Sequence, residues 1–87
     1  MKNEFGKFNQ ILRIKNNEVI KDMALKLEIS DSFLSSIETS KKTISKNIYG
    51  KLVNAYSLNK QKQEELKTAI LNSQRWIKIN IANISTN

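Results

Sequence analysis

The chain of 87 residues contains no cysteine, no histidine and no proline, and only two glycines. Without cysteine, it can form no disulfide, thiol nucleophile or sulfur-ligated metal site. Without histidine, it lacks the commonest general base and the commonest metal ligand. No apolar run approaches the roughly 18 residues of a membrane-spanning helix. We therefore expect no enzyme activity, no cofactor and no metal.

Negative charge is also scarce, because 8 acidic residues face 15 lysines and arginines, for a net charge of +7. Residues 39–63 contain six lysines and no acid. Such a concentration of positive charge favours a polyanionic partner. The charge would also permit binding to RNA or to an anionic membrane. However, the sequence shows neither a basic amphipathic helix nor aromatic residues that would stack on bases.

The lack of helix breakers favours an all-α fold. Apolar residues recur at helical spacing in five segments, which predict helices over about 5–15, 20–27, 30–39, 45–56 and 60–73. Phe33 and Leu34 are predicted core residues. We expect residues 1–73 to form one helical domain.

The last residues, 74–87, follow a different pattern. From Trp76 onward apolar and polar residues alternate, which predicts a short strand-like tail. A lone strand needs a partner, so the tail is predicted to pair with a second copy about a two-fold axis. The interface residues in that case are Trp76, Ile77, Ile79 and Ile81. The alternatives are a tail that covers the helices and a tail that is frayed.

Residues 23–38 have the pattern of a helix, a tight turn and a second helix. Ala24 is small where the two helices would cross, and Ile29 is apolar in the turn. The outward face of the second helix would carry only short polar side chains, which are Asp31, Ser32, Ser35 and Ser36. Such a face can approach base edges in a major groove. The alternative is a solvated surface without a ligand.

These features resemble the helix-turn-helix domain of the Cro and phage-repressor family, also called the xenobiotic-response-element type. The resemblance covers residues 5–58, through Leu12-Arg13, Met23-Ala24, Lys26-Leu27, Ile29-Ser30, Phe33-Leu34-Ser35, Ile37-Glu38 and Lys41. It implies a compact five-helix, lambda-repressor-like domain with residues 30–39 as the recognition helix. It also implies a salt bridge between Arg13 and Glu38.

The chain departs from this family at four positions. Ile20 stands where the family has a phosphate-contacting glutamine, and Glu28 stands where the turn has glycine. A residue with a Cβ atom must then adopt the conformation of that glycine at some cost. Thr39-Ser40 replaces the usual Asn-Gly, and Ile44 replaces a proline.

The resemblance implies a dimeric, sequence-specific DNA-binding regulator, a repressor or autorepressor of a phage or mobile-element operon. It would bind a pseudo-palindromic operator in the cytoplasm of a bacterial or phage-infected cell. The predicted base contacts are Asp31, Ser32, Ser35 and Ser36. The predicted phosphate contacts are Lys21, Thr39, Lys41, Lys42 and Lys46. The alternative is an antitoxin or an anti-defence-associated regulator whose role includes binding a partner protein.

Overall fold

The computed structural model describes the backbone of residues 1–86 and the side chains of residues 1–74. The described chain forms five helices and no strand, which confirms the predicted all-α fold. They are α1 (Glu4–Lys15), α2 (Ile20–Leu27), α3 (Asp31–Glu38), α4 (Lys46–Tyr56) and α5 (Lys60–Thr86). The first four begin and end within a residue or two of the predicted positions.

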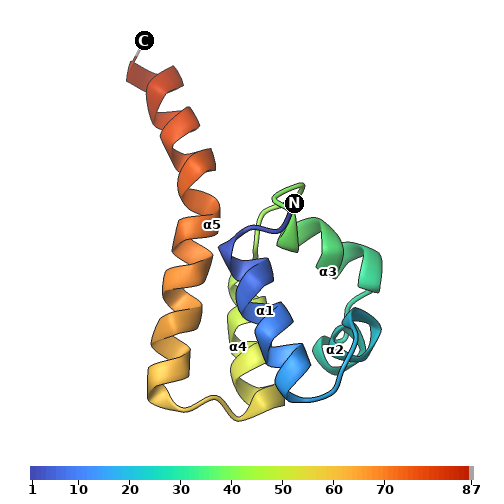
Figure 1. The fold of residues 1–87 in the computed structure, drawn as a ribbon. Coiled ribbons are helices and arrows are strands. Elements are labelled where there is room, and N and C mark those ends of the chain that lie inside the picture. Colours follow the sequence, from blue (N-terminus) through green and yellow to red (C-terminus); the bar gives the residue numbers. More distant parts are fainter. Residues whose placement is uncertain (87) are drawn as a thin grey trace.

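Helix α1 lies at the centre of the arrangement (Figure 1). It packs against α5 on one side and against α2 and α3 on the other, while α4 contacts both α2 and α5. The core between them is apolar. Its fully buried side chains are Phe5, Met23, Leu27, Leu34, Ile37, Leu52 and Leu66.

The helix ends follow from local chemistry. Asn3 begins α1, because its side-chain oxygen accepts the Gly6 N–H at 2.7 Å, and Ser30 begins α3 by accepting the Phe33 N–H at 3.0 Å. Helix α2 ends at Glu28, whose φ of 59° lies in the left-handed region. Glu28 therefore does adopt the glycine-type conformation that the sequence requires of it.

Helix α5 corrects one prediction. The strand expected from Trp76 onward is absent, because α5 continues through it to Thr86. No glycine or proline interrupts the chain after Gly50, so no residue breaks the helix. The isoleucines at 77, 81 and 84 have the spacing i, i+4 and i+7 that is typical of a helix. Those at 77, 79 and 81 alternate with other residues, as in a strand. Apolar periodicity alone therefore did not distinguish the two structures.

None of the described helices combines the length and the apolar character needed to cross a bilayer.

Candidate nucleic-acid interface

The unit formed by α2 and α3 is closed by a tight turn. The Ile29 N–H donates to the Ala24 carbonyl at 3.0 Å, and Ala24 is buried where the helices meet. Leu34 and Ile37 of α3 are fully buried against the core. Only the opposite face of α3 is therefore available to a ligand.

That outward face carries the four predicted base contacts. Asp31, Ser32 and Ser35 are exposed and, with Ile20, line a shallow depression between the start of α2 and α3. Ser36 is half-buried, and its hydroxyl donates to the Phe33 carbonyl at 2.6 Å. The Ser36 hydroxyl can thus accept a further hydrogen bond, but its proton is already donated to Phe33. The structure brings together three available side chains on this face.

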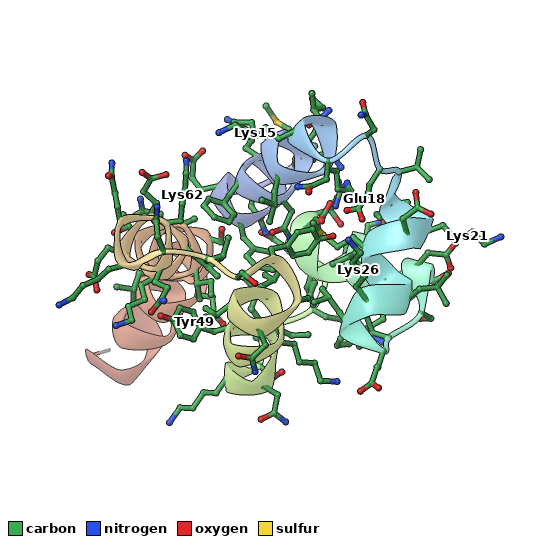
Figure 2. The ribbon with its side chains drawn as sticks, turned by 90° about the horizontal axis from the view of Figure 1, so that it is seen from below. Lys15, Glu18, Lys21, Lys26, Tyr49 and Lys62 are labelled. Atoms are coloured by element: carbon green, nitrogen blue, oxygen red, sulfur yellow. The ribbon has the colours of Figure 1, made fainter. Side chains whose placement is uncertain are left out.

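Cationic side chains flank the same unit. Lys21 projects from α2 into solvent (Figure 2), next to Asp31 across a second depression. Lys41 and Lys42 follow α3, held in place because both backbone N–H groups donate to the Ser36 carbonyl, at 2.9 and 3.2 Å. Lys42 also lies over the Phe33 ring, 5.6 Å from its centroid. Within the described part of the chain, no carboxylate pairs with these three lysines.

The two other predicted phosphate contacts differ in their surroundings. Thr39 is half-buried, and its hydroxyl donates to the Ser35 carbonyl at 2.9 Å, which closes the end of α3. Lys46 is exposed in the first turn of α4 and lines a groove between α4 and α5. Lys46 therefore also borders an apolar groove, which its position in the sequence did not reveal.

The ion pair implied between Arg13 and Glu38 is present. The guanidinium donates to both carboxylate oxygens, at 2.7 and 3.1 Å. The Glu38 side chain is fully buried and also accepts from Asn9 at 3.1 Å and from Lys2 at 3.3 Å. A buried carboxylate with four donors fixes the end of α3 against α1.

Asn3 is a positioning residue that the sequence did not reveal. Its side-chain NH₂ donates to the Ile37 carbonyl at 2.9 Å and to the Ser40 hydroxyl at 3.0 Å. Its backbone N–H donates to the Glu38 carbonyl at 2.8 Å. An asparagine before a helix predicts a cap, and that signal was present. Its second role, in holding the end of α3, arises only from the fold.

Trp76, Ile77, Ile79 and Ile81, the predicted dimer contacts, lie outside the residues whose side chains are described. Among the described residues, no cluster of acidic side chains could hold a metal ion.

Comparison with protein-family models, with curated proteins and with solved structures finds no match to this chain. Its function is therefore inferred from the geometry and the charge of the α2–α3 unit.

Proposed function

We propose that this chain is a sequence-specific DNA-binding regulator that inserts α3 into the major groove. One observation supports this more than any other. The exposed residues of α3 all have short polar side chains, and the buried ion pair of Arg13 and Glu38 fixes the end of this helix against α1.

The side chains of this face suit base recognition. A major groove about 12 Å wide admits one helix, and short side chains let its backbone come close to the base edges. The Asp31 carboxylate accepts hydrogen bonds and suits the amino group of cytosine. The hydroxyls of Ser32 and Ser35 donate or accept, so they suit several bases. We propose that these three residues read the sequence, with Ser36 as an acceptor only.

Phosphate contacts hold the helix in register. Lys21 lies on one side of α3, and Lys41 and Lys42 lie beyond its end, so the cations bracket the reading face. The start of α4 adds to them, because Ser45 makes no side-chain cap and no acid lies in its first turn. Free N–H groups at a helix start attract phosphate. Thr39 and Lys46 remain predicted contacts.

We propose further that the active form is a dimer that represses by occupying a promoter. A single recognition helix reads few base pairs, and a two-fold pair reads two half-sites about one helical turn apart. The backbone of α5 extends beyond the body formed by the other four helices (Figure 1), which provides length for an interface.

The test is binding of the purified protein to a duplex from upstream of its own gene, with a scrambled duplex as competitor. We expect specific binding that Ser32→Ala combined with Ser35→Ala weakens about tenfold, since each lost hydrogen bond costs about 0.5–1.5 kcal/mol. The matched control is Asn54→Ala combined with Thr68→Ala, which removes exposed polar groups from α4 and α5. Equal affinity for both duplexes, collapsing as salt rises, would show that charge alone acts.

A further inference from the structure

A second surface lies away from α3, in a groove between α4 and α5. Its apolar floor is formed by Ile44, Tyr49, Ile70 and Leu71, and it has a volume of about 470 Å³ and is partly open to solvent. Leu71 is 59% exposed, so part of an apolar side chain faces solvent in this groove. The groove therefore offers an apolar side chain a place to bind.

Two hydrogen bonds connect the segments that form the walls of the groove. Tyr49 lies between α4 and α5 (Figure 2), with its hydroxyl 3.5 Å from the Gln63 side-chain oxygen. Gln74 of α5 accepts the backbone N–H of Ile44 at 3.3 Å and so ties the loop before α4 to α5. The concavity is thus formed before any partner arrives.

The rim of the groove is cationic. Lys46 and Lys67 line it, and no acidic residue does. Lys67 has one carboxylate neighbour, Glu64, at 3.5 Å, and both side chains are more than half exposed, so this pair is weak. The start of α4, which lacks an acidic residue, adds partial positive charge at the same end. An occupant that fits must bring carboxylates as well as apolar side chains.

A second copy of this chain does not meet that requirement. Residues 66–87 contain no aspartate or glutamate, so the α5 of another copy brings no carboxylate from this half. Of the acids that precede them, five already form ion pairs within their own chain, so a copy that offered them would exchange one pair for another: Glu4, Glu18, Glu38, Glu64 and Glu65. The others, Asp22, Glu28 and Asp31, belong to the α2–α3 unit. A copy that used them would cover its own DNA-reading face.

We propose that the α4–α5 groove docks an acidic amphipathic segment of a different protein. Its apolar side chains would fill the floor around Leu71, and its carboxylates would meet Lys67 and Lys46. This is the helix-in-groove mode, in which anchors one turn apart enter a preformed apolar channel. The choice of a different protein over a second copy rests on the proposed function, which assigns the α2–α3 unit to DNA. Leu71 and Lys67 take no part in the α3 face, whereas Lys46 is also a predicted phosphate contact.

The test starts from a random library of 12-residue peptides, displayed and selected on the full-length protein at physiological salt. We expect the enriched peptides to combine apolar residues spaced by three or four with several acids. Leu71→Ser and Lys67→Gln should each weaken the selected peptides at least tenfold. The matched controls are Leu25→Ser, which changes an exposed leucine of α2, and Lys60→Gln, which removes the same charge outside the groove. Both controls should bind as the parent does.

Three results would overturn the proposal. One is an enriched pool without an excess of acids, and another is peptide binding that Lys60→Gln weakens as much as Lys67→Gln does. The third is self-association that Leu71→Ser abolishes, which would make a second copy the occupant. Peptide binding is measured without DNA, so a failure here leaves the operator experiment unaffected.

Discussion

At the scale of single residues, the two glycines have opposite surroundings. A Cβ atom added at Gly6 would lie 2.7 Å from the Glu38 carbonyl oxygen and 3.0 Å from the Glu38 Cβ, whereas one added at Gly50 would meet nothing within 4 Å. Gly6 therefore permits the close approach of α1 to the end of α3. Gly50 has no such role inside α4.

We expect Gly6→Ala to lower the free energy of unfolding by about 1–3 kcal/mol, because backbone atoms must move apart. Gly50→Ala should raise it by about 0.5–1 kcal/mol, because alanine loses less entropy in a helix. Urea unfolding of the two variants measures both values. Equal effects of the same sign would contradict the close contact at Gly6.

Tyr56 provides a residue-scale prediction about pH. Its hydroxyl donates to the Glu18 carboxylate at 2.6 Å. Burial, followed by the hydrogen bond and the charge of Glu18, raises the pKa of Tyr56 above its ordinary value of 10.0. The folded protein then retains a proton that the unfolded chain loses. The stability from this group is full below about pH 10 and is lost as the pH rises beyond it.

The variant Tyr56→Phe should remove that part of the pH dependence. We expect the difference in unfolding free energy between parent and variant to be constant at pH 7–9 and to shrink above pH 10. Tyr49→Phe, whose hydroxyl makes only a 3.5 Å contact with Gln63, is the matched control. A difference that stays constant through pH 11 would show that the Glu18 contact does not act in solution.

At the scale of helices, the serines before α3 and α4 form a natural comparison. Ser30 accepts the Phe33 N–H at 3.0 Å, whereas Ser45, in the same position before α4, makes no side-chain cap. Ser30→Ala should therefore lower the unfolding free energy by about 1 kcal/mol, and Ser45→Ala should change it little. Thermal unfolding of both variants checks this, and a larger loss from Ser45→Ala would reverse the assignment.

The helices differ in how far the sequence predicted them. The bounds of α2 were predicted because four of its five apolar residues lie on one stripe, and the helix ends at Glu28. The second half of α5 was assigned wrongly, because its isoleucines fit both a strand and a helix. The decision between the two depends on whether a strand partner exists and on whether the backbone is interrupted. The sequence shows that no glycine or proline follows Gly50, but it does not show whether a strand partner exists.

At the scale of the whole molecule, the lysines differ in whether they pair with an acid of their own helix. Lys7 and Lys62 pair with acids three residues away in their own helices, while Lys41 and Lys42 have no such partner among the described residues. Lys41 and Lys42 therefore place two neighbouring positive charges beyond the end of α3.

The salt dependence of the proposed DNA binding should follow this separation. We expect Lys41→Gln combined with Lys42→Gln to reduce the slope of log K against log salt by about 2, or about 1 for each lost phosphate contact. Lys7→Gln combined with Lys62→Gln removes the same charge and should leave the slope nearly unchanged. Fluorescence anisotropy at several salt concentrations gives both slopes. Equal reductions in the two double variants would assign the effect to net charge.

By itself, the sequence determined the class of fold, the first four helices, the tight turn between α2 and α3 and the short polar face of α3. All of these depend on neighbours within about one helical turn, through apolar spacing, helix caps and the scarcity of breakers. The pairing of Arg13 with Glu38 came from a family resemblance rather than from local chemistry.

The tertiary structure alone decided how distant segments meet. Asn3 holds the end of α3, Lys46 shares a groove with Lys67, and Gly6 allows α1 to approach Glu38. Each of these contacts joins residues more than 15 positions apart, so no local pattern specifies them. They arise because helices that bury their apolar stripes in one core can fit together at only a few angles and distances.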